Sequence, residues 1–308
     1  MQVSAAIRLK PPPGVKCECP ATTRVTIPSV ESAATLERIE ESELDAAPLG
    51  PGSLTWKFFG DRRGVLLAQR AGVLQAMHPA IAAGLLDHSD FFDNPIGRLA
   101  RSSGPIVGVI YDRDPAATGS WVRDQHPGIR GDDAQGRSYH ALDPETYYWA
   151  HATFFEGQIK TRELFARPLT RGEKEQLYAE SITWYARYGV SMRPVPRDFT
   201  AFEEYWQAMF EGTLEATRVA RGSVRRVRNL PAPPGWPKLL WKPVSPALGT
   251  AGPWLTRATL PEEARRLFGF ELSDRDRRGL RAIQAAVRTS WPLVPGRFRM
   301  LPRARTNP

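Results

Sequence analysis

Signals for helix starts recur along this chain, and they constrain its fold more than any other feature. Asp143-Pro144-Glu145 supplies an N-cap, a proline at the first helical position and an acid in the first turn. Thr170, Thr200 and Ser273 each precede a helical run that contains acidic residues. Strict alternation of apolar and polar residues is nearly absent, so the pattern predicts an all-α body. The expected helices cover residues 64–77, 79–88, 95–103, 115–125, 144–166, 171–188, 201–221, 261–268 and 274–290.

Two proline-rich segments border this helical body. Residues 1–50 mix prolines with Ser, Thr and an acidic stretch, so we expect a loose, partly disordered arm, followed by a single domain over 51–308. Residues 229–253 contain seven prolines. Because proline lacks a backbone donor and clashes with the preceding turn, this segment predicts an ordered crossing loop before a basic C-terminal pair of helices.

Basic residues are concentrated in the last third of the chain. From Leu214 onward there are 19 Lys and Arg against 6 Asp and Glu, or +13, whereas residues 1–213 have 23 against 27, or −4. Clustered positive charge attracts polyanions, but no helix-turn-helix, zinc-finger or RNA-binding signature accompanies it. We therefore expect no specific nucleic-acid partner. Peripheral attachment to a membrane stays open, beside a plain solvated surface.

Targeting signals and redox motifs are weak. Cys17 and Cys19 are too few and too close together for a disulfide framework, and the N-terminus lacks the apolar stretch and cleavage site of a secretory signal. The most apolar window, 65–86, is interrupted by residues such as Arg70 and Pro79, so it predicts no membrane span. We expect a cytoplasmic protein and leave its oligomeric state open.

All five histidines lie between Leu74 and Phe154, and two of them are candidate metal ligands. His151 has aromatic residues three and four positions away on both sides, a spacing that surrounds the imidazole with rings. It is either a ligand for the iron of a flat macrocycle or a plain core residue. His126 precedes Pro127, so a helix should end there and leave the imidazole at a cavity wall or in a surface turn.

The other three histidines have structural readings as well. His78 precedes Pro79, which breaks an apolar helix, so its side chain should either cap the preceding turn or face a pocket. His88 is typical of a helix C-terminus, where the dipole favours it, and His140 should be exposed.

A second constellation is cationic. Arg98, Arg101 and Ser102 have the spacing of one helix face. Two fixed positive charges and a hydroxyl would suit haem propionates or polarise bound dioxygen, and the alternative is an exposed arginine pair. No Gly-x-Gly-x-x-Gly, Walker loop, Gly-x-Ser-x-Gly or His-Glu-x-x-His motif offers a competing chemistry.

Taken in order, these motifs resemble a known family. The run from Leu74 to Phe91, Arg98-x-x-Arg101-Ser102, Arg123-x-x-His126, and Ala141-Leu142-Asp143-Pro144 leading to Trp149-Ala150-His151-Ala152-Thr153 are similar to the MpaB-type oxygenase catalytic domain, whose relatives include the rubber oxygenases, or latex-clearing proteins. The resemblance covers roughly Pro51 to Leu214.

The resemblance implies a globin-like helical bundle that holds haem b and oxidises a hydrophobic substrate with dioxygen. It points to His126 as the iron ligand, although Pro127 departs from the usual continuation and His151 therefore stays a candidate. Arg123 and Thr153 are expected near the cofactor. Arg98, Arg101, Ser102 and His78 are expected on the catalytic side. Arg101 replaces a lysine of the rubber oxygenases, and a guanidinium does not easily lose its proton to ligate iron.

Three functions are compatible with these features. The first is a haem b-dependent oxygenase acting on an unsaturated or otherwise hydrophobic small molecule. The second is a haem-binding sensor or carrier without turnover. The third is a basic helical binding protein without a cofactor, in which the histidines are core and cap residues.

Overall fold

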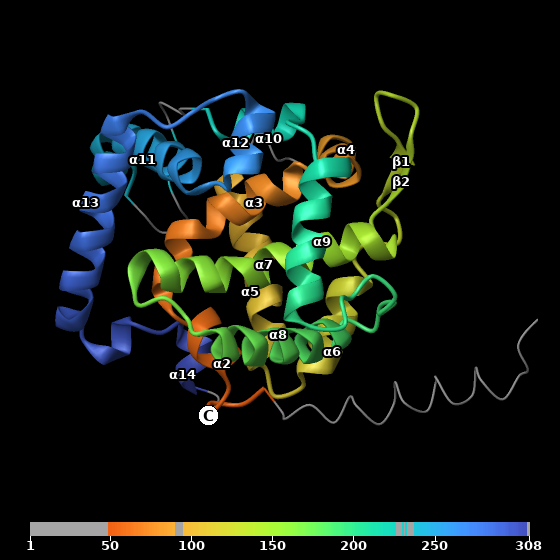
Figure 1. Cartoon of the computed structure of the whole chain (residues 1–308), viewed down its shortest axis with the longest axis horizontal. Coiled ribbons are helices and arrows are strands. Elements are labelled where there is room, and N and C mark those ends of the chain that lie inside the picture. The colour runs from red at the N-terminus through yellow and green to blue at the C-terminus, as the bar shows by residue number, and fades with distance from the viewer. Residues whose placement is uncertain (1–48, 90–94, 226–229, 231, 233–236, 307–308) are drawn as a thin grey trace, which may run out of the picture. The chain divides into compact units, whose positions relative to one another are not determined.

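The computed structural model describes residues 49–89, 95–225, 230, 232 and 237–306, and this part of the chain is all-α apart from one short hairpin (Figure 1), which confirms the expected class. In chain order the elements are α2 (Leu54–Phe59), η1 (Arg62–Leu67), α3 (Ala68–Ala76), α4 (Pro79–His88), α5 (Pro95–Tyr111), α6 (Pro115–Arg123), β1 (Arg130–Asp132), β2 (Ser138–His140), α7 (Pro144–Phe165), α8 (Arg171–Ala186), α9 (Phe199–Gly212), α10 (Arg218–Ser223), α11 (Lys238–Thr259), α12 (Glu262–Phe268), α13 (Asp274–Ser290), η2 (Trp291–Leu293), η3 (Gly296–Phe298) and α14 (Pro302–Thr306).

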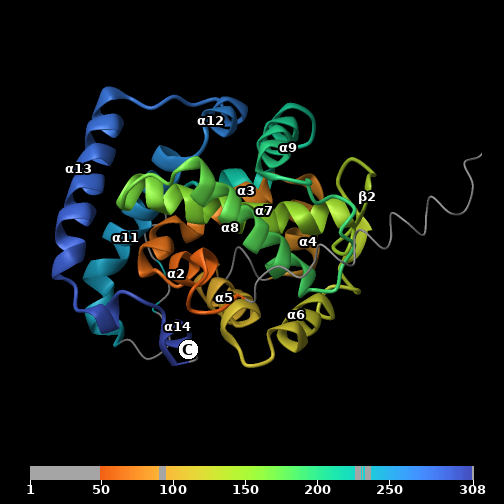
Figure 2. The same ribbon diagram turned by 60° about the horizontal axis from the view of Figure 1, so that its bottom comes forward.

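Helix α7 is the centre of the described fold. The Asp143 carboxylate accepts hydrogen bonds from the backbone nitrogens of Glu145 and Thr146 at 3.1 and 3.2 Å, and Pro144 occupies the first turn. Both views show α7 crossing the middle of the ribbon, with α3, α8 and α9 near it (Figures 1 and 2). Its buried residues lie on several sides of the helix, which explains why its sequence has little amphipathic character.

Of the other three predicted helix starts, at Thr170, Thr200 and Ser273, two are confirmed as N-caps and one is wrong. Thr170 and Ser273 each form a reciprocal capping box at the start of α8 and α13. Thr200 is not a cap, because the Asp198 carboxylate accepts from the Ala201 nitrogen at 2.8 Å. Helix α9 begins at Phe199, two residues before the predicted start at residue 201.

Breaks and extensions of helices differ from the sequence prediction. The run expected over 201–221 is divided into α9 and α10, and α5 continues through Pro105 to Tyr111. The crossing loop expected over 229–253 is wrong for its described second half, because α11 begins at Lys238 and contains Pro243, Pro246 and Pro253. Pro243 and Pro246 are exposed, so water can satisfy the carbonyls that they leave without an intrahelical donor.

The core is one large cluster around α7 and a smaller one beneath α13. The smaller cluster consists of Leu67, Leu164 and Phe165, against which Ile283 and Val287 of α13 pack. The predicted arm falls on residues 1–50, of which 1–48 lie outside the described part, so the division into arm and single domain stays a prediction. Cys17 and Cys19 lie outside it too. Among the described residues, no helix has both the length and the apolar character needed to cross a bilayer.

Candidate functional site

His126 lies just beyond the C-terminal end of α6. This helix begins with the Asp114 carboxylate accepting from the Ala117 nitrogen at 2.9 Å, and a final turn closes when the His126 nitrogen donates to the Arg123 carbonyl at 2.9 Å. The imidazole Nδ1 lies 2.7 Å from the carbonyl oxygen of Val122. Because a carbonyl oxygen can only accept, Nδ1 carries the proton and the lone pair of the neutral ring is on Nε2.

The surroundings of His126 are half-buried and aromatic. Its ring meets the edge of Tyr147 on α7, with centroids 5.7 Å apart and planes at 75°. Arg123, one turn earlier, donates from Nε to Asp124 at 2.8 Å and from Nη1 to the carbonyl of Gly189 at 3.2 Å. A guanidinium therefore lies on the same helix end as the imidazole.

His151 lies in the middle of α7 and is buried, with 3% of its surface exposed. Neither ring nitrogen makes a hydrogen bond with the described residues. Burial lowers its pKa from 6.5 to about 3, and a backbone group of Ser181 opposes this shift only in part. The ring is therefore neutral at physiological pH.

Four aromatic side chains enclose His151. Their ring centroids lie 4.6 Å (Trp184), 5.0 Å (Tyr185), 6.1 Å (Tyr148) and 6.3 Å (Tyr188) from the imidazole centroid. A flat macrocycle could reach a ring nitrogen of His151 only if several of these side chains moved away.

An aromatic wall separates the two candidate ligands. Tyr147 contacts His126, Tyr188 contacts His151, and the centroids of the two tyrosines are 5.5 Å apart. The structure therefore brings the two histidines to opposite sides of one tyrosine layer and not into a shared coordination sphere.

His78 marks the break between α3 and α4, as the sequence predicts, but its Nδ1 does not cap the preceding turn. The carbonyls that the break frees are bonded by distant groups. Trp149 Nε1 donates to Leu74 at 2.9 Å, Thr217 Oγ1 to Ala76 at 2.6 Å and the Glu215 nitrogen to Met77 at 2.9 Å.

The imidazole of His78 is 8% exposed, and its Nδ1 has no hydrogen-bond partner among the described residues. Burial lowers its pKa from 6.5 to about 4, although the charge of Asp143 opposes this. His78 is thus a second buried neutral histidine.

Arg98, Arg101 and Ser102 lie on α5, which forms a hairpin with α6. Ser102 precedes the end of α5 by nine residues (111 − 102), and Asp124 follows the start of α6 by nine (124 − 115), so the two positions lie level across the hairpin. The Ser102 side chain is half-buried, and those of Arg98 and Arg101 lie outside what the structure describes. The backbone therefore brings this motif and His126 to the same end of the hairpin.

The remaining sequence candidates have structural partners. The Thr153 hydroxyl donates to the Ala150 carbonyl at 2.8 Å and accepts from Gln75 Nε2 at 2.9 Å, which joins α7 to α3. His88 ends α4 beside the ring of Tyr139, and His140 is exposed, as expected for both.

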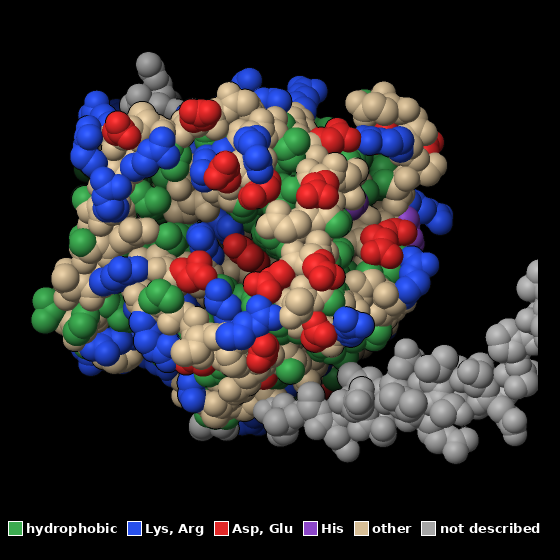
Figure 3. Space-filling model, viewed as in Figure 1, with side chains coloured by type: hydrophobic (Ala, Val, Ile, Leu, Met, Phe, Trp, Pro, Cys, Tyr) green, Lys and Arg blue, Asp and Glu red, His purple; other side chains and the backbone are tan. Residues whose placement is uncertain are grey.

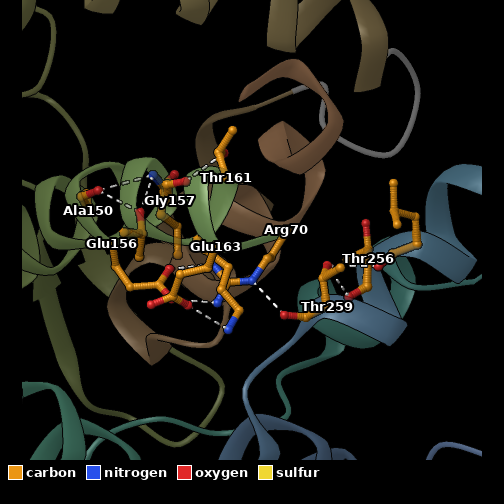
Figure 4. A network of polar contacts seen from close by, with 12 residues as sticks. Arg70, Ala150, Glu156, Gly157, Thr161, Glu163, Thr256 and Thr259 are labelled. Carbon is orange, nitrogen blue, oxygen red and sulfur yellow. Dashed lines mark hydrogen bonds and ion pairs between the residues drawn. The ribbon is translucent and has the colours of Figure 1, made fainter. Parts of the chain in front are cut away.

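A buried ion pair was missed by the sequence reasoning. The guanidinium of Arg70 on α3 is 1% exposed and binds both carboxylate oxygens of Glu156 on α7 (Figure 4). Its Nε donates to the Thr259 carbonyl of α11 at 2.9 Å. A single arginine inside an apolar helical window was the available signal, since buried arginine is rare unless it is paired.

Haem b, which the resemblance implies, needs an axial nitrogen and a flat apolar slot. The residues at His126 fit this donor chemistry, because Nδ1 is held by a carbonyl, as is usual for a metal-ligating histidine. The enclosed ring of His151 does not fit it. Among the described residues, no group of three or more His, Cys, Asp and Glu side chains could hold a metal without a macrocycle.

Two surface hollows lie elsewhere. One of about 390 Å³ is lined by residues of α10 to α12, among them Arg221 and Arg257, and one of about 400 Å³ by residues of α8 and α9, among them Tyr178 and Phe199. Neither is lined by His126 or His151.

Comparison with known proteins gives a consistent result. The chain is 25% identical over 243 residues to an uncharacterized protein of Mycobacterium bovis, Mb2261, and to one of Mycobacterium tuberculosis, Rv2237, and each alignment covers 76% of this chain and 91% of the relative. No solved structure matches the chain significantly. The family profile described as "ER-bound oxygenase mpaB/B'/Rubber oxygenase, catalytic domain" matches residues 56–289. This match spans the helices from α2 to α13, and the chain therefore belongs to the MpaB and rubber oxygenase catalytic-domain family.

Proposed function

We propose that this protein is a haem b-dependent oxygenase that uses dioxygen to oxidise an unsaturated or otherwise hydrophobic small molecule, with His126 as the iron ligand. The observation that carries the proposal is the 2.7 Å contact from Nδ1 of His126 to the Val122 carbonyl. That contact fixes the tautomer with its lone pair on Nε2 and limits rotation of the ring, which are the two properties required of an axial ligand.

The surrounding residues support this assignment. Tyr147 gives the site an aromatic side, and Tyr188 behind it is buried. In such an apolar setting a positive charge acts more strongly than in water. Arg98 and Arg101 would supply that charge from α5, with Ser102 as a hydroxyl donor, and Arg123 would bind a propionate. Bound haem would supply the redox chemistry of dioxygen activation.

His78 and Thr153 have smaller roles in this proposal. The buried neutral ring of His78 would line the apolar side of the pocket and could accept a proton at Nδ1. Thr153 would position α7 through its hydrogen bonds with α3 and would not touch the cofactor.

The test begins with haem retention. The chain is expressed with a haem precursor and purified, and its absorption spectrum is recorded. His126→Ala should abolish the haem band, whereas His151→Leu, which keeps an apolar side chain of similar size, should retain it. His140→Ala is the matched control, because that histidine is exposed. Haem loss only in His151→Leu would contradict the assignment, and a colourless wild-type protein would favour a binding protein without a cofactor.

Oxygen consumption separates the oxygenase from a haem sensor or carrier. With an unsaturated lipid or isoprenoid present, wild-type protein should consume dioxygen. Arg98→Ala should retain haem but consume dioxygen at least roughly tenfold more slowly. One hydrogen-bond donor to a developing oxyanion contributes at least that much to the rate. Haem-loaded protein that consumes no dioxygen with any such substrate would favour the sensor.

A further inference from the structure

The N-terminal half of α11 contacts the rest of the described chain along one narrow stripe. Trp241, Ser245 and Gly249, spaced four residues apart, are its buried positions. Trp241 Nε1 donates to the carbonyl of Leu230 at 2.7 Å, and Ser245 Oγ accepts from the Leu230 nitrogen at 2.6 Å. The other described side chains between residues 239 and 248 are exposed.

The exposed side of this half-helix is apolar. Leu240, Val244 and Leu248 are also spaced four residues apart, so they form one stripe, and they are 61%, 38% and 46% exposed. Leu239 beside them is 83% exposed. We call these four residues the α11 apolar face. Single exposed leucines need no explanation, but a contiguous apolar face usually marks an interaction site.

Helix α13 covers the second half of α11 and leaves the first half open. Trp254 Nε1 donates to Asp276 of α13 at 2.8 Å, and Leu255 packs against the same small core cluster as Ile283 and Val287 of α13. Figures 1 and 2 both place α13 alongside α11. The α11 apolar face therefore begins where this packing ends, and no described helix covers it.

The sequence that contains α11 carries charge of one sign. Between Ala216 and Pro261 the sequence has eight Lys and Arg and no Asp or Glu. Figure 3 shows further Lys and Arg side chains along the edge formed by α13. A second copy of the chain would bring like charges together, so self-association through this face is disfavoured.

We propose that the α11 apolar face docks on an anionic lipid bilayer. A helix that exposes leucines and is flanked by cations can lie in the interface, with its apolar side chains at the boundary of headgroups and acyl chains. Lys and Arg near the surface add attraction to anionic lipids, an attraction that salt screens. Contact would be peripheral, and it holds whether or not the chain binds haem.

The test is sedimentation of the full chain with large vesicles of phosphatidylcholine, with and without phosphatidylglycerol. Wild-type protein should bind the anionic vesicles, and added salt should weaken binding. Leu240→Ser combined with Leu248→Ser should reduce the partition coefficient at least roughly tenfold, since each leucine contributes buried apolar area. Leu86→Ser on α4 is the matched control, because Leu86 is 43% exposed, close to the 46% of Leu248.

Circular dichroism confirms that the variants fold, and Lys242→Glu tests the charge without changing the leucines. It should weaken anionic binding by more than about fivefold, because it removes one cation, which contributes about fivefold, and adds an anion. Equal binding to neutral and anionic vesicles, or wild-type binding by the double leucine variant, would overturn the proposal. Two other results would also overturn it, if wild-type protein does not bind vesicles. One is a concentration-dependent dimer that the leucine variants abolish, and the other is capture of an acidic protein that they abolish.

Discussion

Stability should fall steeply in mild acid, because the fold buries two neutral histidines. The pKa of His151 is lowered from 6.5 to about 3 and that of His78 from 6.5 to about 4, in both cases mainly by burial. Below pH 6.5 the unfolded chain binds protons that the folded chain does not. The stability contributed by the neutral rings is therefore complete above about pH 6.5 and is lost as the pH falls.

The size of the effect follows from the two shifts. At pH 5 each histidine costs about 2 kcal/mol, from about 1.5 pH units at about 1.4 kcal/mol per unit. At pH 4 the two together cost about 6 kcal/mol, because His78 then begins to protonate in the folded state. Since domains are stable by only about 5–15 kcal/mol, this chain should lose a large part of its stability by pH 4.

The assay is urea unfolding followed by circular dichroism at about pH 7.5 and pH 5. His151→Leu removes one titrating ring and retains apolar volume, so its loss between the two pH values should be about 2 kcal/mol smaller than that of the wild type. His140→Gln, at an exposed position, should match the wild type. Carboxylates contribute equally to all three proteins. Identical pH dependence in wild type and His151→Leu would refute the reasoning.

Two further predictions concern packing. Glu156→Gln leaves the buried guanidinium of Arg70 without its counter-charge and should lower the free energy of unfolding in a urea titration by about 3 kcal/mol. Glu175→Gln, in an exposed ion pair, is the control and should lower it by less than about 1 kcal/mol. Gly119→Ala would place its Cβ in steric overlap with the carbonyl oxygen of Arg187, so α6 must shift. We expect a loss of about 1–3 kcal/mol in thermal unfolding, and Gly64→Ala, which meets nothing within 4 Å, is its control. A Gly119→Ala protein as stable as Gly64→Ala would contradict the close approach of α6 to the end of α8.

Local chemistry made much of the fold predictable. The start of α7 follows from Asp143-Pro144, whose side chain and ring act on the adjacent turn, and its observed end at Phe165 lies one residue from the predicted end. The boundary between α9 and α10 had no such signal. There the chain leaves the helix so that Glu215 and Thr217 can bond the carbonyls freed at the α3 break, which only tertiary structure can reveal.

The prolines of α11 led to the opposite error, because a break was predicted where the helix continues. The rule that proline ends a helix counts the lost donor and the steric clash, but it assumes that the freed carbonyls are buried. In α11 the first two prolines are exposed and the buried stripe lies on another side, so packing through that stripe outweighs the local preference. The same arrangement leaves the α11 apolar face uncovered.

Helical spacing predicted that His151 would be surrounded by rings, and it is, but of the four enclosing rings only Tyr148 lies on α7. Trp184, Tyr185 and Tyr188 come from α8 and the turn after it, and no local pattern places them there. Burial that complete argues against a ligand and not for one, since an axial histidine needs one nitrogen held by a protein acceptor and the other facing the macrocycle. His126 is the less buried ring, and its Nδ1 is the one that a carbonyl holds. The sequence supports both histidines as ligands, and the hydrogen bonding of their ring nitrogens is what distinguishes them. That hydrogen bonding depends on where Pro127 ends the turn and not on either motif alone.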